Sequence, residues 1–281
     1  MRMHSLVAVL FLGALVTATA LPAASPGSGA GGGVLVFQRE FSIATINVNG
    51  TGLKLLTGGS SYGPAWSPDG KKIAYALRLS SANLDIAVMN ADGTGGVNLT
   101  NTDAPEYDPA WSPDGTKLAW GGAGVFVANG DGSNPVQIGP GGADSMTWSP
   151  DGGMLAWRYS GNIVVANADG SDLRAVASGV EVDWSPDGQS LLIRSLDDDL
   201  FLITPSGALI RQLTSTPTEG EGGASWSPNG KKIVFSRWNS TVTKVDLYTM
   251  NREGTGVTQV TNDNVNDWAP DWTDAPKKGK S

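Results

Sequence analysis

The pentapeptide Trp-Ser-Pro-Asp-Gly recurs along this chain and constrains the fold more than any other feature. The six tryptophans of the repeat are spaced 45, 37, 36, 42 and 46 residues apart. A repeat of that length is one supersecondary unit that buries its apolar face only against neighbouring copies. The fifth copy has Asn229 in place of Asp, and the sixth is reduced to Trp-Thr-Asp. We assign structural roles to the repeat tryptophans, which are Trp66, Trp111, Trp148, Trp184, Trp226 and Trp272.

The first full repeat predicts four short strands. An apolar strand ends at Trp66, and in the Ser-Pro-Asp-Gly that follows, Pro pre-sets φ and Gly accepts the left-handed conformation of a tight turn. Residues 73–77 and 84–90 then read as buried strands, and an Asp-Gly hairpin turn leads to a fourth strand at 97–100. Because no helical periodicity intervenes, each repeat is predicted to be a propeller blade.

The two ends of the chain predict how the ring closes. The last repeat has only its first strand, around Trp272, whereas residues 34–57 supply three strands without the motif. Together they make one whole blade, which removes the exposed sheet edges. We therefore predict an all-β, six-bladed β-propeller with four antiparallel strands per blade, closed by N-terminal strands pairing with the C-terminal strand. An open β-solenoid is the disfavoured alternative, because neither end carries a polar capping repeat.

These motifs resemble the WD-repeat-like blades of TolB-type six-bladed propellers. The likeness rests on Trp-Ser-Pro-Asp-Gly, on Lys-Lys-Ile-Ala-Tyr at 71–75 and on the Asn-Ala-Asp-Gly turn at 90–93, and it covers residues 34–274. Similar blades occur in prolyl-oligopeptidase-like enzymes, and we expect no counterpart of their hydrolase domain. The resemblance implies a role at the cell envelope, and we expect no counterpart of the separate N-terminal domain of TolB. The fold itself does not define a function.

The first residues predict export. Arg2 and His4 give a basic start, residues 6–16 are apolar, and Ala-Thr-Ala at 18–20 forms a cleavage box. The apolar run is too short to span about 30 Å of hydrocarbon. We therefore expect cleavage, no stable membrane insertion, and a secreted or periplasmic location. The predicted divisions are a signal peptide at 1–20, a flexible leader at 21–33, the propeller at 34–274 and a disordered basic tail at 275–281.

Composition argues against several activities. The net charge is −8 without an extended basic cluster, which disfavours nucleic-acid binding. The only histidine is His4, inside the predicted signal peptide, and cysteine is absent. The mature chain would then lack the usual general base, thiol nucleophile and zinc ligands. Residues 59–63 match Gly-x-Ser-x-Gly, but no histidine exists to activate Ser61. We predict a non-enzymatic protein, and a monomer.

Acidic and aromatic residues near the start of each inner strand predict the binding site. Inner strands begin on the face that carries the variable loops, so these residues should ring the mouth of the central channel. Their charge should attract a Lys/Arg-rich segment of a protein or peptide partner, or a Ca²⁺ ion; no other cofactor is expected. The predicted set is Tyr62, Glu106, Tyr107, Asp108, Asp144, Glu181, Asp183, Glu219, Glu221, Asp267 and Trp268.

Solvated loop carboxylates are the simpler interpretation of this set. Replacing Glu106, Asp108 and Asp183 with Ala is expected to leave the melting temperature nearly unchanged. A further group of residues, all arginines, lies at the ends of the second strands. These arginines would form an anion-binding collar, or they would form structural ion pairs with nearby acids. Arg78 with Asp85 and Arg237 with Asp246 are the expected pairs. This group comprises Arg39, Arg78, Arg158, Arg194 and Arg237.

Two other functions stay open from the sequence. One is a carboxylate-dependent, glycan-active enzyme that uses Glu106 with Asp183. The other is a carbohydrate-binding module, whose aromatic platform would be Tyr107, Tyr159, Trp238 and Trp268. These aromatic residues are equally typical of packing between blades.

Overall fold

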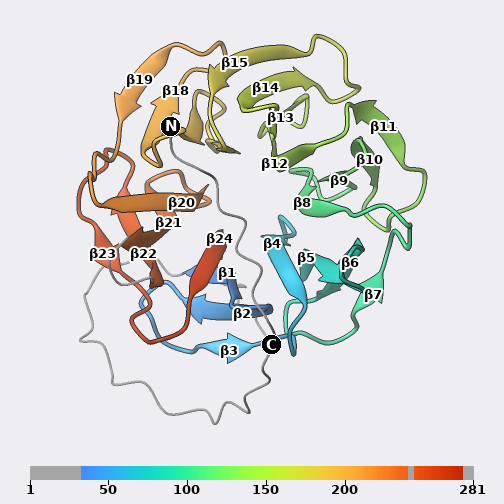
Figure 1. Ribbon diagram of the computed structural model, residues 1–281, viewed down its shortest axis with the longest axis horizontal. Coiled ribbons are helices and arrows are strands. Elements are labelled where there is room, and N and C mark those ends of the chain that lie inside the picture. Colours follow the sequence, from blue (N-terminus) through green and yellow to red (C-terminus); the bar gives the residue numbers. More distant parts are fainter. Residues whose placement is uncertain (1–32, 240–243, 275–281) are drawn as a thin grey trace, which may run out of the picture.

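Six four-stranded antiparallel sheets stand in a ring around a central channel (Figure 1). The computed structural model describes residues 33–239 and 244–274, which contain strands, turns and loops but no helix, and hence no helix long and apolar enough to cross a membrane. The prediction of a six-bladed propeller with four strands per blade is confirmed. The predicted signal peptide, the basic tail and all of the predicted leader except its last residue lie outside the described residues.

Each blade places the strand that carries the motif tryptophan innermost. Blade 1 contains β4 (Ser61–Trp66), β5 (Lys72–Arg78), β6 (Leu84–Asn90) and β7 (Val97–Asn98). Blade 2 contains β8 (Tyr107–Trp111), β9 (Lys117–Gly121), β10 (Val125–Asn129) and β11 (Val136–Gly139). Blade 3 contains β12 (Ala143–Trp148), β13 (Met154–Tyr159), β14 (Asn162–Asn167) and β15 (Arg174–Ser178).

The second half of the ring follows the same order. Blade 4 contains β16 (Glu181–Trp184), β17 (Leu191–Arg194), β18 (Leu200–Ile203) and β19 (Leu209–Gln212). Blade 5 contains β20 (Glu219–Trp226), β21 (Lys232–Asn239), β22 (Val245–Asn251) and β23 (Thr258–Gln259). Blade 6 contains β24 (Asp267–Asp274), β1 (Gly33–Arg39), β2 (Ser42–Asn47) and β3 (Lys54–Leu55).

Blade 6 confirms the predicted closure. The C-terminal strand β24 is its innermost strand and pairs antiparallel with β1, with Leu35 opposite Trp272 and Arg39 opposite Asp267. Segments from the two ends of the described chain therefore share one sheet, and the ring has no open edge between its first and last repeats.

The motif recurs because each of its residues has a task in the turn. In blade 1 the Ser67 hydroxyl donates to Asp69 Oδ1 at 2.7 Å and accepts from the Lys72 N–H at 2.9 Å. Gly70 has φ of 66°, a conformation that glycine adopts at little cost. The hydroxyl-to-Asp bond repeats in the next three motifs, and in the fifth Asn229 accepts it from Ser227 at 3.1 Å.

The hydrophobic core is divided among the gaps between blades. One cluster unites Val36 and Ile43 of blade 6 with Trp66 and Ile73 of blade 1, and each other pair of neighbouring blades among the described residues shares a similar cluster. Five of the six motif tryptophans are buried, and Trp111 is only partly buried. Sheet-to-sheet burial of apolar side chains therefore holds the ring together.

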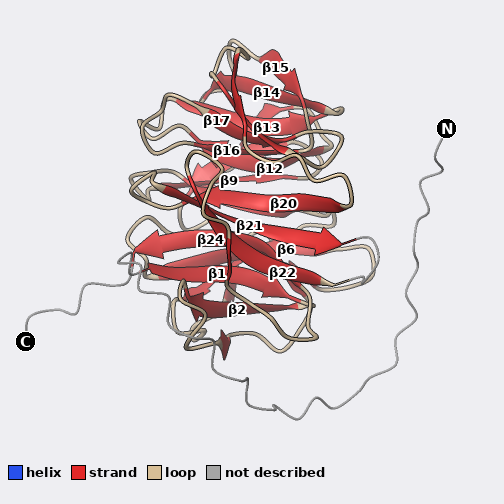
Figure 2. Cartoon of the chain, turned by 90° about the vertical axis from the view of Figure 1, so that its left-hand side faces the viewer, coloured by secondary structure: helices blue, strands red, loops and turns tan. Residues whose placement is uncertain are grey.

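Loops at the two ends of the strands define two different faces (Figure 2). The Ser-Pro-Asp-Gly and Asp-Gly turns form the short-turn face. The opposite face, here called the mouth face, carries the connections between blades and those between second and third strands. Inner strands begin on the mouth face, because their first residues pair with the last residues of the second strands.

Candidate functional site in the central channel and at its mouth

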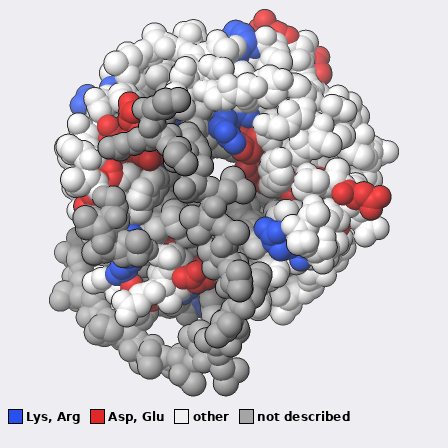
Figure 3. All heavy atoms as spheres, in the orientation of Figure 1, with Lys and Arg blue, Asp and Glu red and all other residues white. Residues whose placement is uncertain are grey.

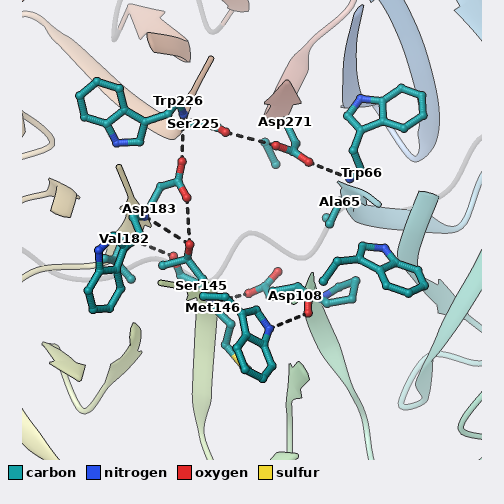
Figure 4. A pocket seen from close by; sticks show the side chains of 18 of the residues that line it. Ala65, Trp66, Asp108, Ser145, Met146, Val182, Asp183, Ser225, Trp226 and Asp271 are labelled. Atoms are coloured by element: carbon teal, nitrogen blue, oxygen red, sulfur yellow. Dashed lines mark hydrogen bonds between the residues drawn. The ribbon is translucent and has the colours of Figure 1, made fainter. Parts of the chain in front are cut away.

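The six inner strands wall a channel cavity of about 360 Å³, which is lined from all six blades (Figure 4). Five of these strands contain a register shift immediately before the residue that precedes the tryptophan; β16 keeps a regular register. Residues in the left-handed region mark each shift, such as Gly63 with φ of 51° and Asp108 with φ of 52°. Pro64 and Pro109 follow them, which is compatible with an irregular edge strand.

Three carboxylates from alternate blades project into this cavity, namely Asp108, Asp183 and Asp271 (Figure 4). Each accepts a hydrogen bond from the backbone of the next blade. The donors are the Ser145 N–H to Asp108 at 2.9 Å, the Trp226 N–H to Asp183 at 2.9 Å and the Trp66 N–H to Asp271 at 2.7 Å. Inner strands leave backbone N–H groups unpaired on their channel side, and these carboxylates satisfy some of them.

Side-chain hydroxyls complete the contacts between inner strands. Thr147 donates to Asp183 at 3.0 Å, and Ser225 donates to Asp271 at 3.2 Å. The Ser145 hydroxyl accepts from the Val182 N–H at 3.0 Å. The channel carboxylates are therefore part of the connection between blades, as well as a polar lining.

Burial in the channel raises the pKa of these carboxyl groups. The pKa of Asp108 rises from 3.8 to about 6, mainly through loss of solvation, with a smaller contribution from nearby acids. Burial likewise raises the pKa of Asp271 to about 6, and the charge of Asp183 adds to the shift. The pKa of Asp183 itself is also raised by burial. The channel therefore holds carboxyl groups that take up protons near neutral pH.

At the mouth, the acidic set and the arginine set form ion pairs with each other. In four blades an acid at the start of the inner strand stands directly opposite the arginine at the end of the second strand. These pairs are Asp267 with Arg39, Asp144 with Arg158, Glu181 with Arg194, and Glu221 with Arg237, which also reaches Glu219. Acidic and basic atoms accordingly lie side by side at the rim of the opening (Figure 3).

The pairing refines one sequence-based expectation and corrects another. Each carboxylate of the four pairs has a guanidinium partner, so the acidic charge at the mouth is partly compensated. Carboxylates still outnumber guanidinium groups there, because Arg39, Arg194 and Arg237 each pair with two of them. The expected Arg78–Asp85 and Arg237–Asp246 pairs are replaced. Arg78 donates to the Tyr62 hydroxyl at 3.1 Å and lies over its ring, while Asp85 accepts from Asn98. Asp246 pairs with Lys244.

Three of the predicted site acids are deeply buried. Glu221 and Asp267 are 0% exposed and Glu106 is 5% exposed. Burial raises the pKa of Asp267 to about 7 despite the opposing charge of Arg39. Asp108 and Asp183 also accept hydrogen bonds from backbone N–H groups of neighbouring blades. The expectation that their alanine variants leave the melting temperature nearly unchanged therefore conflicts with the structure.

The proposed carboxylate pair of the enzyme hypothesis is not assembled. Asp183 lines the channel cavity, but Glu106 does not. Glu106 accepts a hydrogen bond from Thr102 at 3.2 Å, and its N–H donates to Leu84 O at 2.8 Å, which places it between blades 1 and 2. The two acids therefore do not share a cavity in which a glycosidic bond could lie between them.

The aromatic residues of the carbohydrate hypothesis divide into two groups. Trp238 and Trp268 lie with ring centroids 6.2 Å apart at the mouth, and Arg194 lies over Trp238. Trp268 is 37% exposed. Tyr159 packs against the cluster between blades 2 and 3, and the pKa of Tyr107 is raised by burial and by Asp144.

Among residues 33–239 and 244–274, no group of three or more acidic side chains is arranged to hold a metal ion. Alternate blades supply the channel carboxylates, and backbone N–H donors occupy them. Calcium therefore stays a prediction from the sequence.

Sequence reasoning missed two features of the site. Asp271 directly precedes Trp272, as Asp183 precedes Trp184, so alignment of the repeats could have identified it. The second feature is a set of exposed apolar residues on the mouth face. These are Phe41 at 50%, Leu79 at 52% and Leu196 at 63% exposed. They lie in the connections between second and third strands, where turn residues alone gave no signal.

The fold and the channel define a six-bladed β-propeller of the kind built from tryptophan-bearing blades. A family model described as the TolB beta propeller domain matches residues 53–181. A search of curated proteins found no match. The resemblance to TolB-type six-bladed propellers is confirmed.

Solved structures with the same fold include two from TolB proteins. TolB from Acinetobacter baumannii is 16% identical with a TM-score of 0.73, and the alignment covers 85% of this chain but only 66% of that chain. Putative TolB from Agrobacterium tumefaciens is 18% identical with a TM-score of 0.66, covering 82% of this chain and 88% of the other.

Proteins of other kinds share the fold at similar levels. A chain in a nidogen/laminin complex is 13% identical with a TM-score of 0.73, covering 87% of this chain and 99% of that chain. Hydrazine synthase from Kuenenia stuttgartiensis is 15% identical with a TM-score of 0.70, covering 87% of this chain and 47% of that chain. At these identities the likeness concerns the fold alone.

Proposed function

We propose that this chain is an exported, non-catalytic scaffold that binds a protein or peptide partner on its mouth face. The observation that carries the proposal is the set of exposed apolar side chains there, which come from several blades of the ring. Leu79, Leu196 and Trp268 are exposed on the mouth face of a closed ring. Leu196 lies between Arg194 and Asp198 in the chain, whose ion pair could exchange partners with an incoming chain. Exposed aromatic and aliphatic residues next to arginines are typical of protein interfaces.

The arrangement of acids supports binding over catalysis. The mouth carboxylates are engaged with arginines, and the channel carboxylates hold backbone N–H groups of the neighbouring blade. A carboxylate-dependent hydrolase needs an acid and a second carboxylate that flank one bond. The expected partners for that role, Glu106 and Asp183, lie in different surroundings.

The comparisons support the proposal at the level of the fold. One neighbour was solved as a nidogen/laminin complex, so a propeller of this shape occurs in a protein–protein assembly. The likeness to TolB and the apolar start of the chain support export to the cell envelope. A calcium ion in the channel is an additional proposal, for which the carboxylate lining is the support.

Site-specific photo-crosslinking tests the partner site. A photoreactive residue at Leu79 or Leu196 should crosslink a discrete partner from the exported proteome of the native host. Leu209 and Val136 serve as controls, because they are 67% and 60% exposed but lie on the outer strands β19 and β11. Equal crosslinking at the outer positions, or none at the mouth, would contradict the proposal.

Two further measurements refine the test. With the partner purified, Leu196→Ser combined with Trp268→Ala should weaken binding by about tenfold or more, because both remove exposed apolar contact area. Repeating the crosslinking in EDTA tests the calcium proposal: a calcium-dependent site loses the crosslink and a calcium-independent site keeps it.

A further inference from the structure

A second cavity lies on the short-turn face, on the other side of the molecule from the mouth. It measures about 750 Å³ and lies between blades 1 and 2, whose Ser-Pro-Asp-Gly turns form two of its walls. Asn129, Gly130 and Asp131, from the turn after β10, form a third wall. Trp111 also lines it, the one motif tryptophan among the described residues that is not buried.

A single residue explains why this tryptophan is uncovered. In blades 1 and 3, the N–H of the first residue after the third strand donates a hydrogen bond to the carbonyl oxygen of the residue that follows the Ser-Pro-Asp-Gly turn. Ala91 donates in this way to Lys71, and Ala168 to Gly153. Both alanines pack against the clusters that contain the motif tryptophans of their blades. Gly130 occupies this position in blade 2, with its N–H bonded to Thr116 O at 2.8 Å.

Glycine at this position leaves the indole surface open. A Cβ atom on Gly130 would lie 3.0 Å from Cζ3 of Trp111, so any side chain here would contact the ring. Alanine covers the tryptophan in two blades, whereas blade 2 has nothing at the equivalent place.

Blade 5 contains an occupied version of the same arrangement. Arg252 holds the position of Gly130, since its N–H bonds to Lys231 O after the turn. Its guanidinium carbon lies 5.5 Å from the ring centroid of Trp226, and Nη1 donates to Asp187 at 2.7 Å. Asp187 is the motif aspartate of the preceding blade. The equivalent residues between blades 1 and 2 are Trp111 and Asp69, without the arginine.

The charges around the cavity suit a cation. Asp69, Asp114 and Asp131 line it. Lys72 lines it too and acts electrostatically on Asp131, and Lys71 pairs with Asp69 at 3.1 Å, but this second pair is 80% and 55% exposed and is therefore weak. Three carboxylates and two lysines leave a net negative charge beside an aromatic face, which is the combination that cation–π and charge-assisted contacts require.

We propose that this cavity binds an arginine side chain supplied by another protein, with the guanidinium over Trp111 and paired to Asp69. The bound arginine would take the place that Arg252 takes in blade 5. The site is separate from the mouth, so it would give the propeller a second contact with a partner of stated chemistry, an exposed arginine.

Short peptides provide the test. Acetyl-Gly-Arg-Gly-amide is titrated against the full protein and binding is followed by NMR chemical shifts, with the citrulline peptide as the neutral isostere. The arginine peptide should bind, and the citrulline peptide should bind about tenfold more weakly or worse, because it lacks the charge.

Matched variants locate the binding. Asp69→Asn should weaken arginine binding about fivefold or more, since Asn keeps the turn bonds, as Asn229 does, but removes the charge. Asp151→Asn changes the same motif position in blade 3, outside this cavity, and should have no effect. Gly130→Arg should abolish binding by filling the cavity from within. The proposal is overturned if the wild type does not bind the arginine peptide, if citrulline binds equally well, or if Asp69→Asn and Asp151→Asn behave alike.

Discussion

Asp271 and Asp183 occupy the same place in their repeats, directly before the motif tryptophan, and both connect one blade to the next. Asp271 accepts from the Trp66 N–H at 2.7 Å and from the Ser225 hydroxyl at 3.2 Å, so it contacts the blades on both of its sides. A carboxylate in this position satisfies a backbone donor that no other strand reaches.

Replacing Asp271 with Ala should therefore destabilise the ring. The variant leaves the Trp66 N–H without this acceptor, and we expect the free energy of unfolding to fall by about 1–3 kcal/mol. Urea unfolding followed by tryptophan fluorescence measures the change. Asp103→Ala, at an exposed loop position, should unfold like the wild type. An Asp271→Ala midpoint equal to that of Asp103→Ala would show that the contact between blades contributes nothing.

The titration of the channel acids predicts how stability depends on pH. Asp108 and Asp271 have pKa values of about 6 in the folded state against 3.8 for the ordinary group, so the folded protein holds protons that the unfolded chain has released. Their favourable contribution is complete below about pH 4 and is lost as the pH rises through about 6. Each shift corresponds to at most about 3 kcal/mol.

Turn aspartates act in the opposite direction at lower pH. Hydrogen bonds from Ser112 and Ser185 lower the pKa values of Asp114 and Asp187 to about 2, so their contribution is present above about pH 4 and is lost on acidification. The melting temperature should thus be highest near pH 4–5 and lower at pH 8. Asp108→Asn should flatten the profile between pH 5 and 8. A melting temperature that rises over that interval would contradict this assignment.

At the scale of the element, the Ser-Pro-Asp-Gly turn combines one hydroxyl, one carboxylate and one left-handed glycine. Gly152 has φ of 72°, and a Cβ there would meet Pro113 only at 3.6 Å. The surrounding space would accept a methyl group. Glycine is therefore required here because of the backbone conformation and not because of steric crowding.

Two adjacent glycines separate these effects experimentally. Gly152→Ala should lower the free energy of unfolding by about 1–2 kcal/mol, because a residue with a Cβ is destabilised in the left-handed conformation. Gly153→Ala, at a residue outside that region, should be neutral or stabilising by up to about 1 kcal/mol. Thermal unfolding of the two variants measures the difference in their stability. Equal changes in stability at the two positions would show that the left-handed φ is not the cause.

The sequence predicts these elements well where local chemistry specifies them. Turn residues and apolar runs give the strands of every blade, and the unmatched strand at Trp272 gives the ring closure. The ion pairs at the mouth could be identified only once the register between strands was known. Arg194 and Glu181 are 13 residues apart in the chain, and their positions on β17 and β16 place them opposite each other. The burial of Glu106 likewise depends on the contact between blades 1 and 2, which no local pattern encodes.

At the scale of the whole molecule, the ring depends on a strand contributed by the C-terminal part of the chain. β24 walls the channel, pairs with β1 and carries Trp272 into the cluster between blades 5 and 6. A chain that ends at Val265 lacks all of β24 and leaves an inner sheet edge and two apolar faces exposed.

Truncation at Val265 should therefore abolish the single cooperative unfolding transition, whereas a chain ending at Asp274 should keep it. Calorimetry and the binding of a hydrophobic dye report the two outcomes. If the shorter chain melted cooperatively near the temperature of the longer one, the closure would not be a source of stability.

The excess of carboxylates over arginines at the mouth has a kinetic consequence. Long-range attraction accelerates encounter only when one surface presents an uncompensated charge. At the mouth, Arg39, Arg194 and Arg237 each face two carboxylates, so an excess of negative charge remains, and the association rate of a basic partner there should fall as ionic strength rises. The lifetime of the complex would depend instead on the apolar contacts around Leu196 and Trp268, so salt should change the rate of association more than the rate of dissociation.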